Sequence, residues 1–207
     1  MNNYFVRAVR AAVPVATAVR GMPARVRTYS TAGPDYFELL EVPIANVARN
    51  GWSINPGELK RQWLQKMSHV HPDRMVNRPE AEQHAAEQHS ALVNRAYETL
   101  MSPLARAEYL VERLGSDSAE EGTTQANPML LAEVMELQEG VENAETHEEI
   151  DQIDEQNSEH LRAALAALDQ VFEGNPPDVE AAKKCIAELR YWTNIDRAVS
   201  DWRLAHP

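Results

Sequence analysis

The sequence predicts an all-α protein built from two helical units. Apolar residues recur at steps of three and four along most of the chain, which is the period of a helix, and no sustained alternation of apolar and polar residues predicts a strand. A polar, glycine-containing stretch at residues 115–127 has no large apolar side chain, so it is interpreted as a linker. We therefore expect one helical unit at residues 35–114 and a second at residues 128–207.

Composition and charge argue against several classes of protein. No apolar run reaches the ~18 residues that a membrane-spanning helix needs. The lone Cys185 excludes a disulfide framework and a zinc site built from cysteines. Residues 115–207 carry 6 basic and 21 acidic side chains, so this half of the chain is expected to repel nucleic acid. The sequence lacks a glycine-rich phosphate loop, and nucleotide binding is not expected.

The first thirty residues have the composition of a mitochondrial transit peptide. They are rich in alanine and valine, contain five arginines and have no acidic residue. Arg10 and Arg20 interrupt the apolar core that an export signal would need. We predict a transit peptide at residues 1–30, cleaved near Tyr29, and a location in the mitochondrial matrix. A basic arm without regular structure is the alternative.

Helix-start signals place two helices before residue 72. Asp35 can cap a short first helix that contains Phe37. Pro56 lies near the start of the second helix, where its missing N–H costs nothing. Apolar side chains at steps of four, four and three form one face of that helix, namely Leu59, Trp63, Met67 and Val70. Pro72 ends it, because the residue before a proline is pushed out of the helical region.

Two further helices complete the first unit. The third is predicted from Pro79 to Leu100, with one common face formed by Ala85, Leu92, Ala96 and Leu100. Ser102 and Pro103 form the cap and first turn of a fourth helix, which is expected from Leu104 to Leu114.

The second unit is predicted to be an antiparallel three-helix bundle, because it contains three long helical segments joined by short turns. These segments are Pro128 to about Asn143, Thr146 to Phe172 and Asp178 to Trp202. Thr146 and Glu149 have the spacing of a capping box. The first helix carries a core stripe at steps of four, three and four, namely Leu130, Val134, Leu137 and Val141.

A second face of that first helix is also apolar. Leu131 and Met135 lie roughly 90° to 130° from the centre of the core stripe, beside Glu136, Glu139 and Glu142. Two apolar side chains rimmed by carboxylates can anchor a partner. The alternative is that they widen the core face, since globular helices often bury a wide arc.

Between the second and third helices stands His71-Pro72-Asp73, followed by Arg74. Pro72 stiffens the turn, and a carboxylate held there can accept a charge-assisted hydrogen bond from a partner's arginine. The preceding helix is basic, with Lys60, Arg61 and Lys66.

These features together resemble the J-domain, the family of co-chaperones that stimulate the ATPase of DnaK-type chaperones. The resemblance rests on the Tyr-Phe-x-Leu-Leu helix, the basic helix, the His-Pro-Asp tripeptide and Asn94-Arg-Ala-Tyr97-x-x-Leu100. Residues 35–40, 102–110 and 135–139 are similar, more narrowly, to the HscB-type J-proteins of iron–sulfur cluster assembly, and the likeness covers nearly all of residues 35–207. It implies a J-domain at residues 35–114 and a bundle at residues 128–207 that binds an IscU-type scaffold protein.

The resemblance implies two binding sites and no catalytic residue or cofactor. The chaperone is expected to contact His71, Pro72, Asp73, Lys60, Arg61 and Arg74. Lys66 is left out, because it falls within the apolar stripe, where relatives carry an aliphatic residue and where its stem can pack while the amine reaches water. The scaffold protein is expected to contact Leu131, Met135, Glu136, Glu139 and Tyr191. Tyr191 lies off the apolar stripe of the last helix, for which Trp192 is the better core candidate.

Two other functions stay open at this stage. The acidic bundle of a J-domain protein could bind a different client. A histidine-based metal protein is the less favoured alternative, because the candidates near His69, His71 and Asp73 include His84 and His89, which are five residues apart and do not share a helix face. Cys185 is interpreted as a packing residue rather than a reactive thiol.

Overall fold

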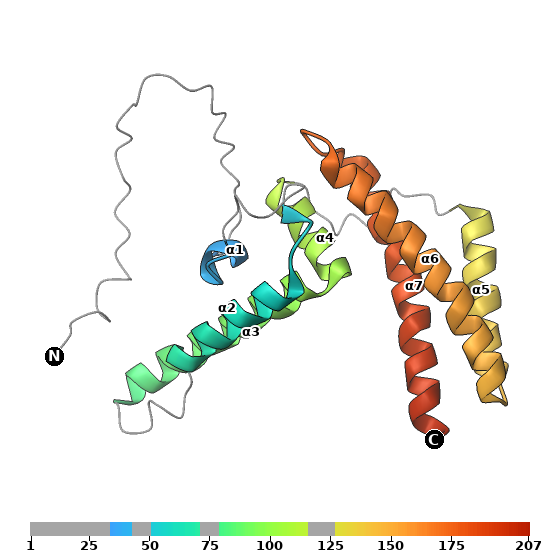
Figure 1. Cartoon of the computed structure of the whole chain (residues 1–207), viewed down its shortest axis with the longest axis horizontal. Coiled ribbons are helices and arrows are strands. Elements are labelled where there is room, and N and C mark those ends of the chain that lie inside the picture. The colour runs from blue at the N-terminus through green and yellow to red at the C-terminus, as the bar shows by residue number, and fades with distance from the viewer. Residues whose placement is uncertain (1–33, 43–50, 71–78, 116–126) are drawn as a thin grey trace.

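The computed structural model describes residues 34–42, 51–70, 79–115 and 127–207. In these ranges the chain forms seven helices, which fall into two groups that meet where α4 packs against α7 (Figure 1). The predicted all-α class is confirmed. The helices in the described ranges include none that combines the length and the apolar character needed to cross a membrane. The predicted transit peptide, the segment from His71 to Arg74 and most of the predicted linker lie outside the described residues, and the predicted domain boundaries stay predictions.

The first group closes by joining its first helix to its last. α1 (Tyr36–Leu39) begins at Asp35, whose Oδ1 accepts a 2.9 Å hydrogen bond from the Phe37 N–H, as the cap signal predicts. α4 (Pro103–Arg113) ends at Arg113, whose Nη2 lies 2.6 Å from Asp35 Oδ2. Tyr109 of α4 stacks on Tyr36 and accepts a 3.0 Å hydrogen bond from the Tyr36 N–H. Asp35 therefore caps α1 and also ties it to the end of α4.

Helices α2 (Pro56–Val70) and α3 (Glu80–Met101) pack against each other as a hairpin (Figure 1). Trp63 of α2 stacks on Tyr97 of α3, and its indole donates a 2.9 Å hydrogen bond to Asn94 Oδ1. Leu59 is fully buried, while Trp63 and Met67 are half-buried against the core. In the part of the predicted α2 stripe whose side chains the structure describes, the residues lie on the face that packs.

The face predicted for α3 was partly wrong. Ala85 is exposed and Leu92 is only half-buried, although Ala96 and Leu100 are buried as expected. The buried stripe runs at steps of four, three, three and four through Ala86, Ser90, Val93, Ala96 and Leu100. Its centre lies about 80° around the helix from Ala85. The prediction failed because small alanines mark both faces of this helix and do not show which one packs.

The second group is the predicted antiparallel three-helix bundle. α5 spans Pro128–Asn143, α6 spans His147–Glu173 and α7 spans Val179–Ala205. Thr146 and Glu149 form the predicted capping box at the start of α6. Val134, Leu137 and Val141 of α5 are buried and Leu130 is half-buried against them, so the predicted stripe faces the core.

Helix α7 continues to Ala205, one turn beyond the predicted end at Trp202. The extra turn is held because the Trp202 indole donates a 3.1 Å hydrogen bond to the carbonyl of Ala144, at the end of α5. The His206 ring stacks on the Trp202 indole, with ring centroids 4.2 Å apart. One tertiary contact and one local contact thus hold the helix past the point that its apolar spacing indicates.

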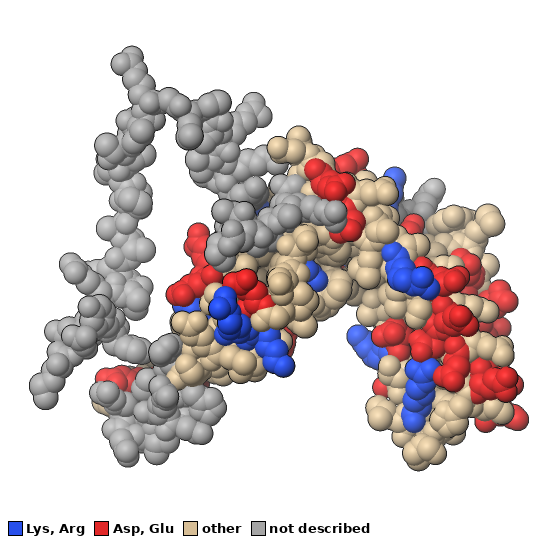
Figure 2. Space-filling view, in the orientation of Figure 1, with Lys and Arg blue, Asp and Glu red and all other residues tan. Residues whose placement is uncertain are grey.

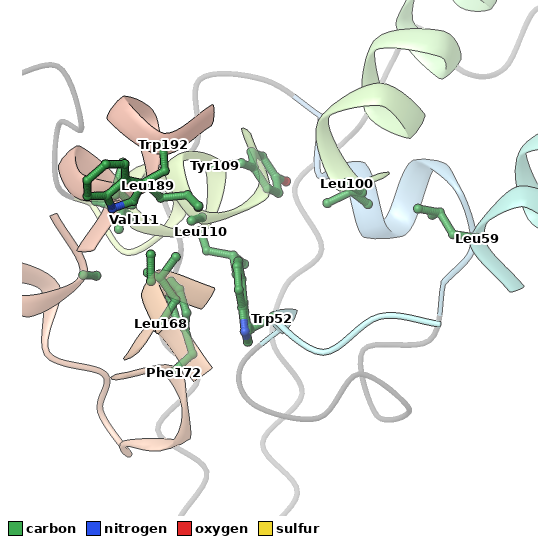
Figure 3. Close-up of a cluster of buried hydrophobic side chains, with 14 of the residues drawn as sticks. Trp52, Leu59, Leu100, Tyr109, Leu110, Val111, Leu168, Phe172, Leu189 and Trp192 are labelled. Atoms are coloured by element: carbon green, nitrogen blue, oxygen red, sulfur yellow. The ribbon is translucent and has the colours of Figure 1, made fainter. Parts of the chain in front are cut away.

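A short turn before α2 carries a tryptophan into the junction between the two groups. Gly51 has a φ of 99°, and a Cβ there would lie 3.0 Å from Phe37 and 3.1 Å from Leu110, so only glycine fits. The turn directs the next residue, Trp52, toward α4 and α6, where its ring stacks on Phe172 with centroids 5.3 Å apart (Figure 3). The apolar core therefore continues from the first group into the second.

Two candidate binding surfaces

The first candidate surface is the solvent-facing side of α2. Lys60 and Arg61 are both exposed there. Arg61 Nη2 lies 2.9 Å from Glu58 Oε1, but the two side chains are 70% and 42% exposed, so this ion pair is weak and leaves the guanidinium accessible. α2 runs to Val70, which is followed directly in the sequence by His71-Pro72-Asp73. Lys60 and Arg61 are thus available to a partner, while His71, Pro72, Asp73 and Arg74 lie outside the described residues.

Lys66 differs from Lys60 and Arg61. Its side chain is 26% exposed, and its Nζ forms an ion pair with Glu41, which follows α1. This is the arrangement expected of a lysine whose stem packs along the apolar face while the amine reaches the surface. The ammonium is held within the first group, so leaving Lys66 out of the predicted chaperone contacts agrees with its geometry.

An apolar residue on α2 escaped the sequence analysis. Leu64 is 52% exposed and does not belong to the face that packs on α3. At about 100° per residue it lies between Lys60 and Arg61 around the helix. This helical phase follows from the sequence, so the exposure of Leu64 was predictable, although the predicted contacts do not include it.

The second candidate surface is the outer side of α5. Leu131 is 36% exposed and Met135 is 61% exposed, whereas their neighbours Val134 and Leu137 are buried. Glu136 and Glu139 are exposed on the same helix. The two apolar side chains therefore lie outside the bundle core, and the reading that they merely widen the core face is wrong. Their role as partner contacts stays a prediction.

Tyr191 of α7 lies at the height of this α5 surface. His160 of α6 contacts both of the other helices in the bundle. Its Nε2 is 3.4 Å from Glu133 Oε1 of α5, and its ring stacks on Trp192 of α7 with centroids 4.2 Å apart. These contacts align the first turns of α5 with the middle of α7. Trp192 is buried, as predicted, and Tyr191 is half-buried at the edge of the core.

The two candidate surfaces differ in charge. Figure 2 shows Lys and Arg side chains gathered over α2, whereas Asp and Glu side chains predominate over the C-terminal helices. The basic face of α2 favours an acidic partner and the acidic face of α5 favours a basic one, because complementary potentials steer encounter and disfavour the wrong partner.

The histidine and cysteine alternatives gain no geometric support. Among the described residues no group of three or more His, Cys, Asp or Glu side chains is placed to hold a metal ion. His71 and Asp73, which belong to that alternative, lie outside the described residues. Burial and the nearby Glu188 carboxylate raise the pKa of the half-buried Cys185 thiol, which suits a packing residue better than a reactive one.

Comparison with known proteins places both helical groups within one family. Residues 126–200 match the model of the HSCB C-terminal oligomerisation domain. The mitochondrial J-type co-chaperone JAC1 of Saccharomyces cerevisiae is 31% identical over 156 residues, which cover 73% of this chain and 79% of that protein. The human iron-sulfur cluster co-chaperone protein HscB is 28% identical over 165 residues, covering 80% of this chain and 67% of the human one. The crystal structure of human co-chaperone protein HscB superposes with a TM-score of 0.72 at 25% identity, over 89% of this chain and 95% of the human chain. The chain thus belongs to the HscB family of J-type co-chaperones.

Proposed function

We propose that this protein is a mitochondrial J-type co-chaperone of iron–sulfur cluster assembly that stimulates the ATPase of a DnaK-type chaperone and delivers an IscU-type scaffold protein to it. The observation that carries the proposal is the separation of two accessible surfaces of opposite charge. A basic face of α2 leads into His71-Pro72-Asp73, and an acidic face of α5 presents Leu131 and Met135. The names of the human and yeast relatives supply the iron–sulfur and mitochondrial context.

The proposed mechanism is coupling rather than covalent chemistry. The α2 face and the His-Pro-Asp tripeptide engage the chaperone and accelerate ATP hydrolysis. The α5 face holds the scaffold protein beside the chaperone at the same moment. ATP hydrolysis moves the chaperone between states that differ in affinity for its bound protein. A scaffold protein that is held beside the chaperone during this change is therefore captured.

Single-turnover ATP hydrolysis by the mitochondrial DnaK-type chaperone tests this proposal. The chain from about Ser30 is added alone and then with the scaffold protein. Hydrolysis is expected to accelerate with the chain alone and to accelerate further with both. Asp73→Ala should abolish the acceleration and leave scaffold affinity unchanged.

Other outcomes would point to other functions. If Asp73→Ala weakened scaffold binding as much as it weakened ATPase stimulation, the proposal of two separate surfaces would be contradicted. Normal ATPase stimulation without scaffold binding would favour a different client for the acidic bundle. Stoichiometric zinc or iron in the purified protein would revive the metal-protein alternative.

The matrix location rests on residues 1–30 and is tested separately. A reporter fused after residue 34 should be imported into isolated mitochondria and shortened near Tyr29. Replacing Arg20, Arg25 and Arg27 by glutamine should block import, because the basic charge of such segments directs them.

A further inference from the structure

Leu64 is a large apolar side chain that the packing of α2 does not explain. It is 52% exposed, whereas Leu59 on the packed face is 1% exposed. Relative to the direction shared by Leu59, Trp63 and Met67, Leu64 points about 100° away from the core. Scattered exposed leucines are common on protein surfaces, so exposure alone assigns no role.

The surroundings of Leu64 distinguish it. Lys60 precedes it by four residues and Arg61 by three, so both cations lie one turn away, on either side of it around the helix. Both are exposed. The leucine is therefore the apolar centre of a basic patch, which we define as Lys60, Arg61 and Leu64.

Position along the helix adds a second argument. α2 rises about 1.5 Å per residue, so Arg61 and Val70 are separated by roughly 14 Å. Leu64 lies between them. A partner that contacts Arg61 and also the residues that follow Val70 in the sequence would extend along the part of α2 that carries Leu64.

We propose that Leu64 is the apolar anchor of the chaperone contact. This inference rests on the proposed function and names a further residue for it. The occupant is a surface of the chaperone's ATPase domain that has an acidic rim, complementary to Lys60 and Arg61, around an apolar depression. A side chain contributes most to binding where the surrounding contacts exclude water from it. The cations provide steering, and Leu64 provides the contact that is desolvated on binding.

The test compares Leu64→Gln with Leu204→Gln in the single-turnover ATPase assay, without scaffold. Leu204 is the matched control, because it is a leucine that is 81% exposed near the end of α7. Leu64→Gln should raise the co-chaperone concentration for half-maximal stimulation about tenfold, which corresponds to burial of about half of a leucine's apolar surface. Leu204→Gln and the conservative Leu64→Met should stay within about twofold of the wild type. Circular dichroism and thermal unfolding of all three variants should match the wild type, since both leucines are exposed.

Salt separates the apolar contact from the charges around it. The tenfold deficit of Leu64→Gln should persist from about 0.05 M to 0.5 M NaCl, whereas the deficit of Lys60→Ala should shrink as the charges are screened. Wild-type behaviour of Leu64→Gln, or a deficit that disappears with salt, would overturn the proposal.

Including Asp73→Ala in the same assay distinguishes failure of the Leu64 assignment from failure of the proposed function. If Asp73→Ala loses stimulation and Leu64→Gln does not, only the assignment of Leu64 fails. If the wild-type chain itself gives no stimulation, the proposed function fails and the assignment of Leu64 fails with it.

Discussion

The indole Nε1 of Trp52 donates a 2.7 Å hydrogen bond to Asp169 Oδ1, joining two residues that are 117 positions apart. Trp52 belongs to the first helical group and Asp169 to α6 of the second. The carbonyl of Trp52 accepts a 2.9 Å hydrogen bond from Arg106 Nη1, whose guanidinium also lies over the indole ring. Arg190 and Glu108 form a second link between α7 and α4, 2.7 Å apart. The two candidate binding surfaces are therefore carried on groups whose relative position is fixed by directional contacts.

Trp52→Phe is expected to loosen this junction. Phenylalanine keeps an aromatic ring next to Phe172 but removes the donor to Asp169, so the free energy of unfolding should fall by about 1 kcal/mol. Distances between labels placed on α3 and α6 should become more widely distributed, which double electron–electron resonance can measure. ATPase stimulation by the variant alone should be retained, while the additional stimulation given by scaffold should decrease.

Trp202→Phe provides the matched control. Its indole also donates a hydrogen bond, to Ala144, but both residues belong to the second group. Loss of this hydrogen bond should lower the free energy of unfolding by a similar amount without broadening the distribution of label distances between the two groups. Unchanged distance distributions in Trp52→Phe would show that the Trp52–Asp169 bond does not set the arrangement.

Local signals in the sequence predicted most of the fold. Asp35, Ser102 and Thr146 act as helix caps as expected, because a cap depends on residues within one turn of each other. The pairing of Trp52 with Asp169 could not be predicted, because it depends on how two separate groups dock.

The candidate site residues also differ in whether local sequence can predict their positions. Helical phase places Leu131 and Met135 away from the centre of the core stripe but leaves open whether they widen the core face, and their exposure in the structure decides this. Helical phase likewise places Leu64 off the packed face of α2, so its exposure is also predictable from the sequence. The height of Tyr191 beside α5 follows from the contacts of His160, which is on a third helix, so no local pattern could reveal it.

The α5 surface is tested by Leu131→Ala and Met135→Ala. Each substitution should weaken scaffold binding about tenfold, because each removes an exposed apolar side chain from the centre of the proposed contact. Stimulation of the chaperone ATPase in the absence of scaffold should not change. Isothermal titration calorimetry with purified scaffold protein measures the affinities.

Met129→Ala is a suitable control for the α5 surface. Met129 is on the same helix and is 79% exposed, but it lies about 120° around the helix from Met135. The substitution should leave affinity within about twofold of the wild type. Equal losses in all three variants would indicate general weakening of α5 instead of a defined contact.

Asn157 offers a test of bundle stability. It is fully buried in α6, and neither amide atom of its side chain has a hydrogen-bond partner within the described part of the protein. Asn157→Leu keeps the number and branching of the side-chain heavy atoms and removes the unsatisfied polar atoms, so it should raise the free energy of unfolding by about 1–3 kcal/mol. Asn157→Ala should instead lower it, because the smaller side chain leaves a cavity. Urea denaturation distinguishes them, and a less stable Asn157→Leu would mean that the polar amide contributes favourably to the core.

The capping box of α6 predicts a pH dependence. The backbone N–H groups of Glu145 and Thr146 donate hydrogen bonds of 2.9 and 3.1 Å to Glu149 Oε2. These bonds, together with one from the Thr146 side chain, lower the pKa of the Glu149 carboxyl from its ordinary value of 4.5. A carboxyl whose pKa is lower in the folded state stabilises the fold above its unfolded pKa, and this contribution is lost as the pH falls through the folded value.

Glu149→Gln should therefore reduce stability at pH 7 and have progressively less effect as the pH falls below 4.5. Glu148→Gln is the control, since it removes the same charge from the neighbouring exposed position in the first turn of α6. Urea midpoints between about pH 7 and pH 3 measure the difference between each variant and the wild type, which isolates one carboxyl from the others that titrate in this range. The Glu149 difference should decline with acidity and exceed the Glu148 difference at pH 7, because only Glu149 completes the capping box. Equal differences for the two variants at every pH would mean that charge at the helix start matters and the hydrogen-bonded cap does not.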